Sequence, residues 1–221
     1  MSRRIAIAVE TGAKKVFATA VDWPGWSRSG KTEGAALEAL AASAARYAIV
    51  TAEAGEAFVA PPGVDDLEIV ERNPGGSGTD FGVPGNVTEH DRRPVPHAEA
   101  DRLRRLVAAA WTVFDRVAEG APAGLRKGPR GGGRDRDKIV DHVLNADHAY
   151  CQVMGLRVAA PSPSDPDSIE AMRSAMLGLL GRPSDGSPLG GRKWPPRYAA
   201  GRVAWHALDH AWEIEDRSGP S

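Results

Sequence analysis

Three histidines of this chain stand at spacings that could hold a metal ion. His206 and His210 are four residues apart, so on a helix their imidazoles lie one turn apart on the same face. By the same helical phase, His142 shares one side of an earlier segment with Ile139 and Val143. Imidazoles at i and i+4 can reach one divalent cation, and a third from a neighbouring helix completes a set of three nitrogen ligands. The sequence therefore predicts a metal site, and the alternative is that these are hydrogen-bonded core histidines.

Further polar residues near these histidines have more than one interpretation. Glu213 lies three residues beyond the pair, where it could act as a catalytic group that accepts a proton from metal-bound water, or orient a ligand. Its other interpretation is a solvated carboxylate in an acidic run. His148 is an alternative to His142 on the same segment. His90 and His97 fall in or beside an expected linker, so we expect both to be solvated.

Four helical segments in the second part of the chain would position the histidines. Apolar residues recur at i, i+3, i+4 and i+7 over residues 97–120, 134–155, 165–181 and 197–217. Asp165 is expected to cap the third segment, with Pro166 at its first position. Pro195 and Pro196 are expected to lie outside the fourth. We predict an antiparallel four-helix bundle over residues 95–221.

The first part of the chain has a different pattern. Alternating apolar residues over 5–9 and 16–21 predict a β-hairpin, 33–47 predicts a helix, and 58–59 and 67–70 predict two short strands. Residues 1–72 are therefore expected to form a small antiparallel sheet with one helix. Residues 73–94 contain several Gly and Pro and no periodicity, so they are expected to be a linker. The predicted fold class is α+β.

The composition limits the classes of protein to which the chain can belong. Its 221 residues are 42% hydrophobic and 26% charged, which is typical of a globular protein and excludes disorder throughout. With 28 basic against 29 acidic residues, the net charge of -1 lacks the excess that a nucleic-acid binder needs. No run approaches the roughly 18 to 20 apolar residues of a membrane span, so we expect a cytoplasmic protein with no membrane partner. The single cysteine, Cys151, leaves a metal to nitrogen and oxygen ligands and is interpreted as a structural or free thiol.

Two segments suggest anion binding. Residues 25–32 match the phosphate-binding loop, with two glycines followed by Lys31 and Thr32, between a strand-like run and a helix. The preceding strand follows a tight hairpin and no apolar strand ending in Asp comes later, which favours a Gly turn with Thr32 as a helix cap. The basic run 125–134 is either a solvated loop or an anion-binding lip.

The first part resembles the HicB-like family over about residues 3–72. The resemblance is carried by a Pro-Gly turn, a Gly-x-Thr and an acidic, Ala-rich helix start, in the segments Trp23-Pro24-Gly25-Trp26, Gly30-Lys31-Thr32 and Glu33-Gly34-Ala35-Ala36-Leu37. It implies a small antiparallel sheet with a packed helix, known best as an antitoxin that masks the HicA toxin. The DNA-binding tail that such antitoxins often carry is missing here, which suggests a docking or lid element.

The second part is similar to the DinB-like superfamily over about residues 95–217. The two segments that match its metal motifs are 141–150 and 206–210. The resemblance implies a four-helix bundle in which His142, His206 and His210 bind zinc or nickel. It also implies a thiol-dependent transferase, isomerase or hydrolase acting on a small molecule. Arg, Ala, Gly and Pro are abundant, as in a GC-rich bacterium, so mycothiol is the first co-substrate to test.

A contrasting hypothesis is a non-catalytic interaction protein of the antitoxin type. In it the HicB-like half binds a partner and the helical bundle is structural, so no metal is bound. Trp205 and Trp212 are seven residues apart on the outward side of the last helix and are too large and apolar to remain in water. They are expected to pack against the first domain or against a second subunit in a homodimer.

Overall fold

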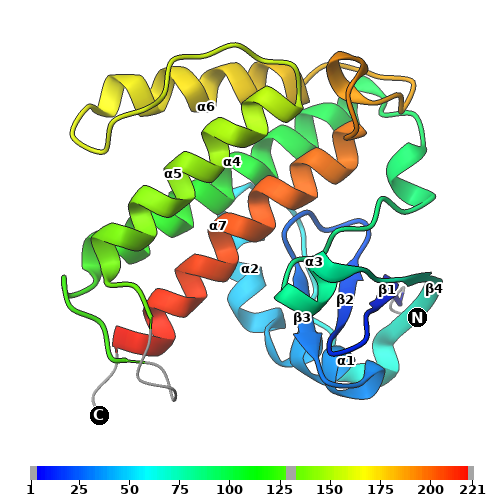
Figure 1. Ribbon diagram of the computed structural model, residues 1–221. Coiled ribbons are helices and arrows are strands. Elements are labelled where there is room, and N and C mark those ends of the chain that lie inside the picture. Colours follow the sequence, from blue (N-terminus) through cyan, green and yellow to red (C-terminus); the bar gives the residue numbers. More distant parts are fainter. Residues whose placement is uncertain (1–3, 128–132, 219–221) are drawn as a thin grey trace.

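A computed structural model describes residues 4–127 and 133–218 of the chain (Figure 1). Within these ranges the fold is mixed α+β, with one four-stranded sheet and seven α-helices. The sheet and the first two helices come from the first part of the chain, the third helix from the segment expected to be a linker, and the four long helices from the second part.

The sheet is mixed, so the expectation of a purely antiparallel sheet is wrong. Its strands are β1 (Ile5–Thr11), β2 (Val16–Ala20), β3 (Ser27–Gly30) and β4 (Leu67–Pro74), in the order β3-β2-β1-β4. β1 and β3 both pair antiparallel with β2, as hairpin connections allow. β4 pairs parallel with β1, because the chain crosses over through two helices before it returns to the sheet.

Two helices stand where one was expected. α1 (Glu33–Ala42) packs against β2 and β3, and α2 (Ala44–Glu53) packs against the first long helix. They meet at Ser43 with a bend of 50°. Because of this bend, one continuous apolar stretch packs on two surfaces: α1 covers the sheet, and α2 packs against the second part of the chain.

An aromatic cluster forms the core beside the sheet. Trp26 is fully buried and stacks on Tyr47 with ring centroids 5.3 Å apart, and its Nε1 donates a hydrogen bond to Ser43 Oγ at 3.0 Å. Phe58 packs edge-on against the same indole. Residues 58–59 are not a strand, contrary to expectation: Phe58 is held by ring packing and not by a β-ladder.

Residues 75–94 contain a short helix, α3 (Ser77–Phe81), and fold back onto the sheet. The contact is made by Glu10 of β1, which is buried. Its carboxylate accepts hydrogen bonds from the backbone amides of Gly85 and Asn86, both at 2.9 Å, and from the Thr79 hydroxyl. A buried carboxylate with three donors is compensated for its desolvation and fixes this segment against β1.

The four long helices lie close to their expected bounds. They are α4 (His97–Gly120), α5 (Arg136–Val153), α6 (Pro166–Leu180) and α7 (Pro196–Ser218). Asp165 caps α6 as predicted, accepting a hydrogen bond from the Ser168 amide. Pro196 was expected outside the last helix but is its first residue, where a proline costs nothing because that amide has no partner within the helix.

α7 lies between the sheet and the other long helices (Figure 1). Trp205 packs edge-on against Phe17 of β2, and Trp212 lies beneath the guanidinium of Arg28, which confirms that both indoles pack against the first part of the chain. The backbone comes close to α7 at Gly25, whose φ is 89° and where a Cβ would lie 2.9 Å from that of Ala204. Only glycine suits this position.

No single helix in the part of the chain that the structure describes is long and apolar enough to cross a membrane; the bent pair α1 and α2 reaches that length and composition only when taken together.

Candidate metal centre

The three predicted histidines lie together between α5 and α7. His142 comes from α5, and His206 and His210 come from successive turns of α7. The three potential ligand nitrogens all lie within 4.8 Å of one another. The Nε2 atoms of His142 and His206 are 3.3 Å apart. The helical phase that selected these residues therefore predicted a real convergence of side chains.

The spacing suits a divalent ion. In a tetrahedral site with zinc–nitrogen bonds of about 2.0–2.1 Å, two ligand nitrogens lie about 3.3–3.4 Å apart. The His142–His206 distance has this value. His210 completes the set, with its ligand nitrogen within 4.8 Å of the other two. The donor set, three imidazoles on two helices, is one that zinc and nickel accept.

Burial favours the neutral, metal-binding form of two of the imidazoles, those of His206 and His142. His206 is 7% exposed, and its burial, reinforced by the neighbouring His210 and His142, lowers its pKa to about 2. Burial also lowers the pKa of His142. A neutral imidazole offers a lone pair to a cation, so metal binding does not compete with a proton at neutral pH.

Glu213 fixes the orientation of His210. Its Oε2 is 2.9 Å from His210 Nδ1, and its Oε1 accepts a hydrogen bond from Arg217 at 2.7 Å. The hydrogen bond from His210 lowers the pKa of Glu213. With Nδ1 engaged, His210 presents Nε2 to the other two histidines. Of the roles considered for Glu213, this contact favours orienting a ligand.

The remaining histidines lie apart from the cluster. His148 Nε2 is 3.1 Å from the carbonyl oxygen of Val158, which removes it as the alternative to His142. His97 is exposed, as expected. His90 was expected to be solvated but its side chain is only 13% exposed, because it packs beside Asp22 with 3.4 Å between Nε2 and Oδ1.

A buried acid on α5 was missed by the sequence analysis. Asp147 is fully buried, and its Oδ2 accepts a hydrogen bond from Trp111 Nε1 at 2.9 Å. Burial raises its pKa to about 7. Helical spacing could have indicated that Asp147 is buried, since it lies four residues from both Val143 and Cys151, on the buried face of α5. Cys151 is also buried, and burial raises its pKa to about 12, so the thiol is not an activated nucleophile.

The segment that resembles a phosphate-binding loop is not a loop. Residues 27–30 form β3, whose backbone pairs with β2, so these amides cannot surround a phosphate. Lys31 is exposed. Thr32 caps α1 by accepting a hydrogen bond from the Ala35 amide at 3.2 Å. Of the basic run 125–134, residues 128–132 lie outside the described residues.

Thr32→Ala is expected to lower the free energy of unfolding by about 1 kcal/mol, because the first turn of α1 loses its side-chain acceptor. Lys31→Ala is expected to leave stability unchanged, and ATP with magnesium to leave the melting temperature of the wild-type chain unchanged. Thermal unfolding of the wild type and of both variants, with and without nucleotide, measures these three effects. A rise in melting temperature with ATP that Lys31→Ala removes would show instead that the segment binds nucleotide.

No protein-family model, no curated protein and no solved structure was found to match this chain, so the site is interpreted from its own geometry.

Proposed function

We propose that the chain is a divalent-metal-dependent enzyme whose ion is held by His142, His206 and His210. The observation that carries the proposal is the convergence of three ligand nitrogens within 4.8 Å, from two helices. Two of these nitrogens, on His142 and His206, are 3.3 Å apart, and a divalent cation between the three rings would bind all three lone pairs at once. This arrangement supports the proposal of a metal site more directly than any single histidine does.

The protein groups have separate roles in this proposal. His142 and His206 hold the ion through Nε2, and Glu213 keeps His210 in the tautomer that does the same. A divalent ion held by three neutral imidazoles supplies a Lewis acid, which lowers the pKa of a coordinated water or thiol. Arg217 holds the second oxygen of Glu213, so the carboxylate cannot rotate away from the imidazole.

The order of the elements supports the resemblance to DinB-like enzymes. One histidine lies on the second of four long helices and the i, i+4 pair on the fourth. We infer from this a thiol-dependent transferase, isomerase or hydrolase that acts on a small molecule, with mycothiol as the co-substrate to test first. The HicB-like half would then support α7, the helix that carries two of the three ligands.

Elemental analysis of untagged, dialysed protein tests the metal site. We expect close to one zinc or nickel per chain in the wild type, and none in a variant with His142, His206 and His210 all changed to Ala. His148→Ala is the matched control, because His148 lies on the same helix but bonds to Val158 and not to the cluster. This control is expected to keep its metal.

The proposal fails if the wild-type chain holds no metal after reconstitution with zinc or nickel. It also fails if the triple variant retains as much metal as the His148→Ala control. In either case the histidines would be core residues, and the interaction-protein hypothesis would become the better one.

A further inference from the structure

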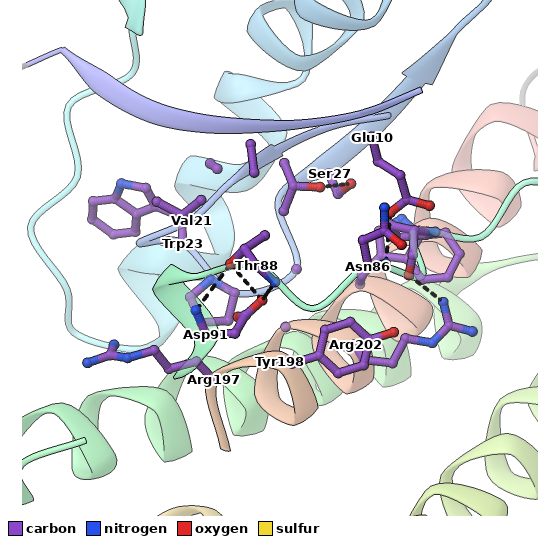
Figure 2. Close-up of a pocket in the computed structure, with 18 of the residues that line it drawn as sticks. Glu10, Val21, Trp23, Ser27, Asn86, Thr88, Asp91, Arg197, Tyr198 and Arg202 are labelled. Atoms are coloured by element: carbon purple, nitrogen blue, oxygen red, sulfur yellow. Dashed lines mark hydrogen bonds between the residues drawn. The ribbon is translucent and has the colours of Figure 1, made fainter. Parts of the chain in front are cut away.

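A cavity lies between the sheet and the first half of α7, away from the histidine cluster. It is partly enclosed, and the space in which the centre of a water molecule can move is about 70 Å³. Figure 2 shows it bounded by β1 and β2, by the segment that carries Asn86 and Thr88, and by Tyr198 and Arg202 of α7. On this measure a water needs about 10–15 Å³, so the cavity has room for about five waters or a small organic molecule.

The cavity exists because small residues face each other across it. Ala8, Thr19 and Ser27 are register partners on β1, β2 and β3, so they form one row across the sheet. Phe17 is two residues from Thr19 on the same face and packs on α7, so the row also faces α7. Opposite, Gly201 has no side chain, and a Cβ placed there would meet nothing within 4 Å. A sheet face against a helix would ordinarily be filled by larger side chains.

The acidic groups of the wall have their partners within the protein. Glu10 accepts from two backbone amides and from Thr79. Asp91 accepts hydrogen bonds from the amide and the hydroxyl of Thr88, at 2.7 and 2.8 Å. A cationic ligand would therefore lose its hydration without gaining a free carboxylate.

The basic groups of the wall direct their charges away from the centre of the cavity. In Figure 2 the guanidinium groups of Arg197 and Arg202 lie at opposite outer ends of the site. Arg197 pairs with Glu99 at 2.5 Å. Arg202 donates to the carbonyl of Pro84 at 3.3 Å and rests on the ring of Trp205, 4.8 Å from its centroid. An anion in the centre would gain little from either guanidinium.

What remains for a ligand is a mostly apolar space with a few hydroxyl groups and two carboxamides whose N–H groups already donate within the protein. The hydroxyls of Thr19 and Ser27 lie 2.7 Å apart on the sheet side, and either can donate or accept. The rings of Trp23 and Tyr198 belong to the wall as well. Apolar lining with a small number of polar groups is the usual character of a small-molecule site.

We propose that this cavity binds a small, neutral, mostly apolar molecule that carries one hydroxyl or carbonyl group, with Thr19 and Ser27 as its hydrogen-bond partners. The site is distinct from the histidine cluster, and its existence does not depend on a metal. It would place the ligand against α7 one turn before His206.

Titration of the ¹⁵N-labelled full-length protein tests the proposal, with benzyl alcohol, benzoate and benzylammonium as probes of similar size and different charge. We expect saturable shifts of amide signals with benzyl alcohol, centred on Thr19, Ser27 and Gly201. Benzoate and benzylammonium are expected to bind more weakly. Shifts centred elsewhere, no saturable shift with benzyl alcohol, or tighter binding of either ion would overturn the proposal.

A cavity-filling variant gives an independent test. Gly201→Leu places a side chain in the open space and is expected to abolish the benzyl alcohol shifts without lowering the melting temperature. Gly178→Leu is the matched control, since Gly178 is also in a helix with nothing within 4 Å of a Cβ but lies outside the cavity. It is expected to bind as the wild type does. Equal binding of benzyl alcohol by the two variants would contradict the proposal that the ligand occupies this cavity. If Gly201→Leu does not fold, the positions of the shifted amide signals in the wild-type protein test the proposal by themselves.

Discussion

A Glu213→Gln protein is expected to bind zinc about 10 to 100 times more weakly than the wild-type chain. The carboxylate of Glu213 lies 2.9 Å from His210 Nδ1, and as the acceptor of that N–H it holds the ring with Nε2 towards the cluster. Its negative charge also makes the imidazole a stronger donor to a cation. Glutamine retains an acceptor oxygen but removes the charge and the ion pair with Arg217.

A competition titration against a chromophoric chelator at neutral pH measures this affinity. Glu215→Gln is the matched control, because Glu215 lies on the same helix and pairs with Arg46 but does not touch a histidine. We expect the control to keep the wild-type affinity. If both variants lost affinity equally, the effect would come from the overall charge of α7, and Glu213 would have no special role in orienting His210.

The long helices could be predicted because their signals are local. Apolar residues at helical spacing and the cap formed by Asp165 and Pro166 lie within a few residues of one another. The parallel pairing of β4 with β1 could not be predicted in this way, because alternation indicates a strand without indicating its partner. The break at Ser43 was missed for a related reason: the apolar pattern continues through it, and the bend is set by what the two halves pack against.

The candidate site shows the same division between local and distant contacts. His206, His210 and Glu213 lie within eight residues on one helix, so spacing alone brings them together. The hydrogen bond between Asp147 and Trp111 joins two helices, and no sequence pattern around either residue indicates its partner. The cavity depends on three strands in register and on a glycine more than 170 residues further along the chain, which no local pattern describes.

Asp147→Asn is expected to make the metal-free protein gain stability as the pH rises from 5 to 8, a range over which the stability of the wild-type chain changes little. Burial raises the pKa of Asp147 from 3.8 to about 7, so the folded state holds a proton that the unfolded state has released. Stability is therefore lost as the pH rises from about 4 to 7. From pH 5 to pH 8 this loss is about 3 kcal/mol. Asparagine has no proton to release, and its Oδ1 can still accept from Trp111.

His206 acts in the opposite direction. Its pKa is lowered from 6.5 to about 2 in the folded state, so below pH 6.5 the unfolded state binds a proton that the folded state does not. Stability is lost as the pH falls below that value, by about 2 kcal/mol at pH 5. In the wild-type chain the effects of Asp147 and His206 nearly cancel. Asp147→Asn removes the opposing effect of the carboxyl group, so this variant should become more stable from pH 5 to pH 8, and the lowered pKa of His142 acts in the same direction as that of His206.

Urea unfolding in the presence of a chelator, at pH 5, 6, 7 and 8, measures these slopes. His206→Asn is expected to lose stability over the same range, because it removes the larger of the histidine effects that oppose Asp147. Asp141→Asn, an exposed position on the same helix, should run parallel to the wild type. If the curve for Asp147→Asn also ran parallel to the wild type, Asp147 would be ionised in the folded protein throughout this range. The buried oxygen that has no partner among the described residues would then have to be solvated by water.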